Sequence, residues 1–212
     1  MSDNRYKVVL LGESDVGKRE LMLGFTEVKF SPNFVNIQSS HYTLKTLAFQ
    51  DGKSVTLEIW DTAGQEKFRS LAKIYYKDAK VVILVYDITS EKSFTELKEY
   101  WYEQVKLDGR KDVIFVVVAN KNEFYQQMQV TYEEGEEFAK SIGAGFFCNS
   151  SLSNSGINEM FNYIGKKLLN PNYDIYEEKN KAKEEYEKKR KERMNLKTDL
   201  KGKKQKKDCI IF

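Results

Sequence analysis

The run Gly12-Glu13-Ser14-Asp15-Val16-Gly17-Lys18-Arg19 has two glycines and a lysine at the spacing of a phosphate-binding loop. It follows an apolar segment of strand length, residues 6–11, and precedes a segment with helical periodicity, residues 20–25. In that context, backbone N–H groups and the positive end of the helix cradle the α- and β-phosphates, while Lys18 reaches the β/γ oxygens. The run therefore predicts a nucleotide site.

Arg19 departs from this motif, because its position normally carries a Ser or Thr whose hydroxyl binds Mg²⁺. A guanidinium has five donors and no acceptor, so it cannot be a metal ligand. Three arrangements remain open: Arg19 pairs with Asp61, or it neutralises β/γ oxygens itself, or it turns to solvent while Asp61 and water hold the ion. The first two predict weak dependence on Mg²⁺.

Three further polar segments follow strand-like segments. They are Asp61-Thr62-Ala63-Gly64-Gln65-Glu66, Asn120-Lys121-Asn122-Glu123 and Asn149-Ser150-Ser151-Leu152. Ligands of open α/β sheets bind outside the carboxyl ends of the strands, so we expect these segments to converge on the phosphate loop. The carboxylate of Asp61 could hold the water shell of a metal ion.

The elements that position these segments follow from apolar patterning. Near-continuous apolar runs at 81–86 and 113–119 are typical of strands covered on both faces, and stripes of helical period lie at 94–105 and 157–168. This alternation predicts an α/β fold: a doubly wound, mostly parallel six-stranded sheet with helices on both faces. Residues 42–50 and 53–60, joined by a two-residue Asp51-Gly52 turn, predict an antiparallel hairpin at its edge.

Length, composition and charge divide the chain. With 212 residues and 41% hydrophobic content, we expect one domain, residues 1–170, and a tail, residues 171–212. Two cysteines, no secretory signal and no membrane-spanning run favour a cytosolic chain. The tail carries 14 Lys and Arg against 9 Asp and Glu, whereas residues 1–170 carry 21 against 23. This argues against a nucleic-acid-binding domain and for a tail that meets an anionic surface.

The tail combines a charged segment with a lipidation signal. Glu and Lys pairs spaced i,i+4 predict a solvated helix to about Arg193, and no apolar heptad supports a coiled coil. A flexible end then leads to Cys209-Ile210-Ile211-Phe212, a prenylation box whose final Phe favours geranylgeranylation. Five lysines between 201 and 207 add a polybasic patch. A lipid and a basic patch together predict stable anchoring at the cytoplasmic face of a membrane, with a cytosolic pool.

Over residues 5–169 the sequence resembles the Rab family within the Ras superfamily of small GTPases. The phosphate loop, the run from Trp60 to Ser70, Tyr75-Tyr76 and the run from Leu84 to Thr89 carry the resemblance. It implies a P-loop fold, GTP and GDP as ligands, hydrolysis of GTP, and effector, exchange and activating proteins as partners in membrane trafficking.

The resemblance also implies roles for individual residues. Gln65 would orient the attacking water, and Gly64 would sense the γ-phosphate through its backbone. Phe30 and Lys121 would sandwich the base, and Asn120 would brace the loop. Glu123 would accept hydrogen bonds from guanine, and Ser150, Ser151 and Leu152 would form the remaining base loop.

The positions at which this sequence differs from the family pattern are mostly ones that bind the metal or the base. The switch I threonine that binds Mg²⁺ and the γ-phosphate falls on Ile37 or Gln38, depending on the direction of counting. This disagreement suggests an insertion, with a bulge between Leu44 and Leu47 as one location. Glu123 stands where the family has Asp, and the extra methylene is expected to weaken guanine selectivity.

Three functions remain in competition. The first is a prenylated Rab-like switch with slow hydrolysis. The second is a pseudo-GTPase scaffold with permanent or no nucleotide, favoured by Arg19 and by Ile37 or Gln38. The third, an ATP-using enzyme, follows only if Glu123 abolishes the preference for guanine.

Overall fold

The computed structural model describes residues 4–26, 42–62, 69–150 and 152–190. The chain divides into two units, residues 1–171 and residues 172–212. The first unit contains the sheet and the polar segments that follow its strands. The second contains a charged helix, residues 175–190.

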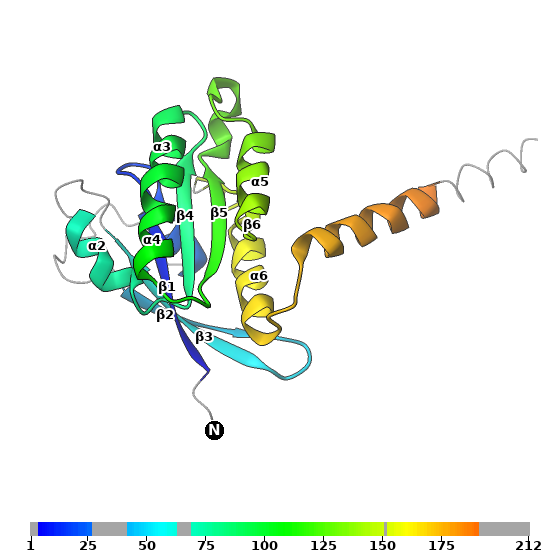
Figure 1. Ribbon diagram of the computed structural model, residues 1–212. Coiled ribbons are helices and arrows are strands. Elements are labelled where there is room, and N and C mark those ends of the chain that lie inside the picture. The colour runs from blue at the N-terminus through cyan, green and yellow to red at the C-terminus, as the bar shows by residue number, and fades with distance from the viewer. Residues whose placement is uncertain (1–3, 27–41, 63–68, 151, 191–212) are drawn as a thin grey trace, which may run out of the picture. The chain divides into compact units, whose positions relative to one another are not determined.

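The first unit is built on a six-stranded sheet in the order β2-β3-β1-β4-β5-β6 (Figure 1). All neighbouring strands are parallel except β2 and β3, which are antiparallel at the edge. The predicted fold class is therefore confirmed. The strands are β1 (Arg5–Leu11), β2 (Tyr42–Ala48), β3 (Ser54–Asp61), β4 (Val81–Asp87), β5 (Ile114–Asn120) and β6 (Gly145–Cys148).

The central strands are apolar because helices cover both faces of the sheet. Every residue of β4 is buried, and so are the last five residues of β5. On one face, the strands pack against α2 (Arg69–Tyr76), α3 (Glu91–Glu96), η2 (Leu97–Tyr102), α4 (Glu103–Asp108) and α5 (Tyr132–Ser141). Figure 1 shows α3, α4 and α5 against β4 and β5. The second helical layer holds α1 (Lys18–Thr26) and α6 (Ile157–Leu169), where Phe25 stacks on Phe161 with ring centroids 3.7 Å apart.

The apolar stripe at 94–105 is buried as predicted, but its helix is not uniform. Ser90 caps its start, its hydroxyl accepting from the Ser93 N–H. The middle turn, η2, is a π-helix with hydrogen bonds of the i→i+5 type, a feature often found at functional sites. Trp101 lies in this turn and is almost fully buried.

Two expectations for the edge hairpin were wrong. The ladder from Tyr42 opposite Trp60 to Ala48 opposite Ser54 is continuous, so no bulge lies between Leu44 and Leu47. The turn is not the two-residue Asp51-Gly52 type either. Phe49 N–H donates to Lys53, and Gly52 N–H donates to Phe49 with Gly52 at φ 79°. This leaves a three-residue loop, residues 50–52, in which glycine takes the left-handed position.

The second unit is helical where it is described. The helix at 175–190 is mostly exposed and carries i,i+4 ion pairs, Glu177 with Lys181 at 3.7 Å and Glu185 with Lys189 at 2.7 Å. The rest of the predicted helix, the lysines after residue 200 and Cys209 lie outside the described residues. Among the helices that are described, none combines the length and apolar character needed to cross a membrane.

Candidate nucleotide-binding site

The loop between β1 and α1 has the backbone of a phosphate-binding turn. Gly12, Asp15 and Gly17 have φ values of 148°, 59° and 89°. A side chain at Gly12 would place its Cβ 2.2 Å from the carbonyl oxygen of Val85, so only glycine fits there. Asp15 is exposed at the loop tip, where an Asp tolerates the left-handed conformation. The loop therefore has the backbone conformation of a phosphate-binding turn directly before the N-terminus of α1.

Lys18 is the first residue of α1, and its ammonium group is buried against the loop. Its Nζ donates to the carbonyl oxygens of Gly12 at 3.0 Å and Glu13 at 2.6 Å. Burial lowers the pKa of Lys18, and the carboxylates of Asp61 and Glu13 oppose that shift. A buried cation at this point can neutralise phosphate oxygens at little further desolvation.

Asp61 and Thr62 lie at the carboxyl end of β3, beside the loop. Asp61 pairs in register with Leu10 of β1, and the Thr62 hydroxyl donates to the Leu10 carbonyl at 2.7 Å. Both side chains are buried. The predicted convergence of this segment with the phosphate loop is therefore present.

Asn120 connects the phosphate loop to the third polar segment. It is fully buried at the end of β5, and its Nδ2 donates to the carbonyl oxygen of Val16 at 2.7 Å. Asn122 N–H donates to Asn149, and Asn149 N–H donates to Ala119. These bonds hold the loops after β1, β5 and β6 together at one edge of the sheet.

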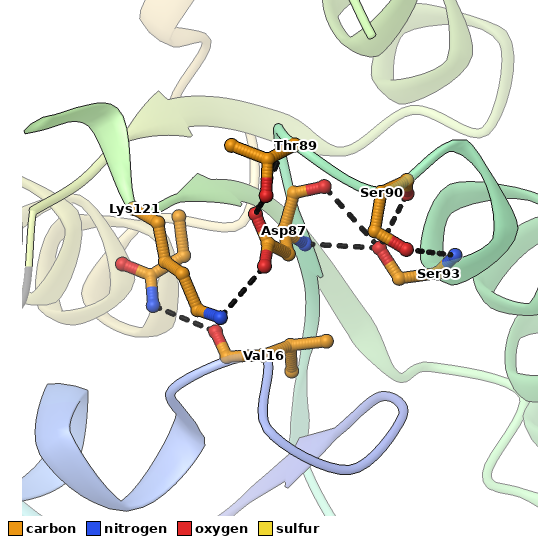
Figure 2. Close-up of polar contacts among 7 residues, drawn as sticks. Val16, Asp87, Thr89, Ser90, Ser93 and Lys121 are labelled. Atoms are coloured by element: carbon orange, nitrogen blue, oxygen red, sulfur yellow. Dashed lines mark hydrogen bonds and ion pairs between the residues drawn. The ribbon is translucent and has the colours of Figure 1, made fainter. Parts of the chain in front are cut away.

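Lys121 and Glu123 follow Asn120 in this cluster. Lys121 has a left-handed backbone at φ 63°, and its Nζ lies 2.7 Å from Asp87 Oδ2 (Figure 2). Glu123 is in η3 (Asn122–Gln127), and its Oε2 is buried with no hydrogen-bond partner among the described residues. A buried carboxylate oxygen of this kind suits a ligand that supplies N–H donors.

The last loop contributes a buried and an exposed residue. The Ser150 side chain is buried and accepts from the Ser153 N–H, whereas Leu152 is 80% exposed. Ser14 in the phosphate loop and Arg19 in the first turn of α1 are also exposed. Phe30, Ile37, Gln38, Gly64, Gln65 and Ser151 lie outside the described residues.

The direct Mg²⁺ position of the loop does not fit the metal. Arg19 occupies it and offers no acceptor atom. No group of three His, Cys, Asp or Glu side chains that could hold a metal ion occurs in the described part of the chain. Among the described carboxylates, those of Asp61 and Glu13 act most strongly on the charge of Lys18.

Sequence reasoning missed two contacts at this site. The first is Trp101, whose Nε1 donates to Glu13 Oε1 at 3.0 Å. The second is Asp87, which holds Lys121. Asp87 is a carboxylate directly after six apolar residues of β4, so its position alone could have marked it.

A glycine loop with a buried lysine at a helix N-terminus, and a polar loop tied to it at the same sheet edge, define a P-loop nucleotide-binding protein. Comparison with known proteins narrows this class. A model of the family described as "Ras family" matches residues 7–170. The chain is similar to Ras-related protein Rab-21 of Homo sapiens, with 40% identity over 164 residues, 77% of this chain and 72% of that protein.

Two fungal relatives agree. Ras-related protein SEC4 of Saccharomyces cerevisiae is 37% identical over 166 residues, covering 78% of this chain and 76% of that protein. GTP-binding protein ypt2 of Schizosaccharomyces pombe is 34% identical over 176 residues, covering 83% and 87%. The chain belongs to the Rab family of small GTPases, within the Ras superfamily.

Proposed function

We propose that this chain is a Rab-like switch that binds GTP and GDP on a membrane and acts in vesicle trafficking. One observation carries the proposal. Asn120 Nδ2 donates to the Val16 carbonyl at 2.7 Å, which joins the phosphate loop to the segment Asn120–Glu123. Lys18 is buried at the end of the first, and Glu123 Oε2 is buried in the second. Such a site can grip a phosphate chain and a base at once.

In this proposal the phosphate loop holds the phosphates through the backbone of residues 12–18, with Lys18 on the β/γ oxygens. Lys121 and Phe30 cover the two faces of the base. Glu123 Oε2, which is buried without a partner among the described residues, accepts from the guanine edge. Ser150, Ser151 and Leu152 border the base through their backbone.

Hydrolysis of GTP is proposed to be slow. Gln65 would orient water and Gly64 would sense the γ-phosphate, both outside the described residues. Arg19 removes one direct metal ligand, and Ile37 or Gln38 removes the second expected one. Because charge stabilisation at the β/γ oxygens dominates catalysis in this class, these replacements are expected to slow turnover.

Membrane attachment is proposed to come from the tail, residues 171–212, and nucleotide binding from residues 1–170. A prenyl group on Cys209 and the lysines before it would supply two signals for the cytoplasmic face, with a cytosolic pool. Effectors, exchange factors and activating proteins are the expected partners, and nucleic acid is not.

A second candidate is a pseudo-GTPase scaffold with permanent or no nucleotide and weak dependence on Mg²⁺. Arg19 at the metal position favours it. The two candidates differ in whether the chain exchanges and hydrolyses nucleotide.

Single-turnover hydrolysis and partner binding together test the proposal. The full chain is loaded with labelled GTP, and phosphate release is compared with that of Gln65→Leu. Proteins captured from a membrane extract are compared between GDP and a non-hydrolysable GTP analogue. Slow release that Gln65→Leu abolishes, with capture in one state only, supports the switch. No release and equal capture in both states would favour the scaffold.

The membrane part needs a separate test. The chain is prenylated and mixed with vesicles of neutral or anionic lipid, with Cys209→Ser as the matched control. Co-sedimentation that needs both Cys209 and anionic lipid supports the anchor, and equal sedimentation of the Cys209→Ser chain contradicts it.

A further inference from the structure

Asp87 closes β4 with a carboxylate that the assigned roles of the site leave unused. Figure 2 shows Asp87 between Thr89 and Lys121, with Ser90 and Ser93 to its right. We propose that Asp87 is a positioning residue that holds the Lys121 side chain in place against the base and so slows nucleotide release. The inference rests on the proposed function, because it needs Lys121 to contact a bound base.

The carboxylate of Asp87 is itself fixed. Its Oδ1 accepts from the Thr89 N–H at 2.8 Å and from the Thr89 hydroxyl at 2.7 Å. The Asp87 N–H donates to Ser93 Oγ at 3.1 Å, and that hydroxyl donates to the Ser90 carbonyl at 2.7 Å. These bonds orient the carboxylate so that its other oxygen, Oδ2, is available to Lys121.

Lys121 is held at both ends. Its backbone takes the left-handed conformation at φ 63°, between Asn120, which bonds to Val16, and Asn122, whose N–H bonds to Asn149. Its Nζ lies 2.7 Å from Asp87 Oδ2, with the lysine side chain 28% exposed and that of Asp87 10% exposed. The four-carbon stem is thereby ordered before any ligand binds.

The ordering of the Lys121 side chain before a ligand binds should strengthen nucleotide binding. A free lysine side chain loses rotamer entropy when it settles against a ligand, and pairing with a fixed carboxylate removes most of that loss in advance. The ion pair is also mostly desolvated at Asp87, so removing one partner leaves a poorly solvated charge on the other. Asp87 should therefore act on the ligand through Lys121.

Loss of Asp87 should weaken the contact with the base and leave the contacts with the phosphates unchanged. Asp87 pairs in register with Asn120 of β5, directly before Lys121, whereas Lys18 begins α1 after the phosphate loop. Contact of an aliphatic stem with the face of a purine does not depend on the exocyclic amino group. Loss of Asp87 should therefore weaken GDP and IDP equally.

The test is the dissociation rate of fluorescently labelled GDP from the full chain, chased with excess GDP. Asp87→Asn should release the nucleotide about tenfold faster. Thr89→Val, which removes the hydroxyl bond to Oδ1 but keeps the N–H bond, should release it about threefold faster. The ratio of GDP to IDP affinity should not change. Asp112→Asn is the matched control, because Asp112 also pairs with a lysine at 2.7 Å, but it is 57% exposed and follows α4.

A double-mutant cycle separates positioning from a structural role. In a Lys121→Met background, Asp87→Asn should add less than about a twofold change in rate. Acceleration that persists in that background would overturn the proposal, as would unchanged rates in both Asp87→Asn and Thr89→Val. Should Asp87→Asn fail to fold, the cycle of Thr89→Val with Lys121→Met decides in the same way. If the wild-type chain binds GDP and the variants release it at an unchanged rate, this inference alone is refuted. If the wild-type chain binds no GDP, the proposed function is refuted with it.

Discussion

The indole Nε1 of Trp101 donates to the Glu13 carboxylate across 3.0 Å, joining residues 88 positions apart in the chain. Both side chains are buried, at 4% and 8% exposure. Glu13 belongs to the phosphate loop, and its carbonyl oxygen accepts from Lys18. Trp101 reaches it from the π-helical turn η2, so this turn contacts the phosphate loop at Glu13, whereas Asn120 contacts the loop at Val16.

Replacing Trp101 by Phe should lower the free energy of unfolding by about 2 kcal/mol, because a buried carboxylate loses a charge-assisted hydrogen bond. Urea unfolding measures this. Trp60→Phe is the matched control, since the Trp60 indole nitrogen is buried without a hydrogen-bond partner among the described residues. Equal losses in the two variants would show that ring volume, not the bond to Glu13, is responsible.

Replacing Arg19 by Ser should increase dependence on Mg²⁺, because a hydroxyl restores the direct ligand that a guanidinium cannot supply. The measurement is GDP release with and without a chelator. We expect chelation to accelerate release in Arg19→Ser far more than in the wild-type chain. Equal sensitivity of the two chains to chelation would contradict the idea that Arg19 replaces the metal.

Shortening Glu123 to Asp should sharpen base selectivity. The extra methylene displaces the carboxylate from the geometry that the family uses, and recognition through buried hydrogen bonds is sensitive to such displacement. Competition of labelled GDP by GDP and by IDP measures the ratio, which should rise roughly tenfold in Glu123→Asp. An unchanged ratio would mean that Glu123 already meets the guanine edge correctly.

Stability should depend on pH through Lys18. Burial lowers the pKa of its ammonium below the unfolded value of 10.5, so the unfolded chain binds more protons as pH approaches that value. Stability in the ligand-free chain should therefore rise with pH within this window. Tyr76, whose pKa burial raises to about 12, acts in the opposite direction above pH 10.

Comparison with Lys18→Met isolates the contribution of the lysine. The melting temperature of the wild-type chain minus that of the variant should increase between about pH 8 and 10. Tyr76 is present in both chains and its contribution largely cancels. A flat or falling difference would show that the pKa of Lys18 is not lowered in the folded chain.

The fold was predictable because its central strands are apolar on both faces and its loops carry motif residues at fixed spacing. Gly12 is one case, since the close approach of Val85 excludes any side chain there. The hairpin register was not predictable from Asp51-Gly52, because the same dipeptide fits a two-residue and a three-residue loop.

Contacts between segments far apart in the chain could not be predicted from the sequence either. Trp101 falls in an apolar stripe of the sequence, which does not reveal that its polar nitrogen donates to Glu13 from the π-helical turn η2. Asp87 falls in a run that resembles the family, and its pairing with Lys121 depends on the alignment of β4 with β5. Both are tertiary contacts, which the local pattern of apolar and polar residues does not predict.

The central claim is that the loops at the carboxyl ends of β1, β3, β5 and β6 hold a guanine nucleotide. The most direct measurement is to purify the full chain, denature it, and identify any released nucleotide by chromatography, with Lys18→Ala purified in parallel. We predict GDP or GTP in near-equal amount to the wild-type protein and little from the variant. Adenine nucleotide, or no nucleotide in the purified chain together with no binding of added GDP, would contradict the account.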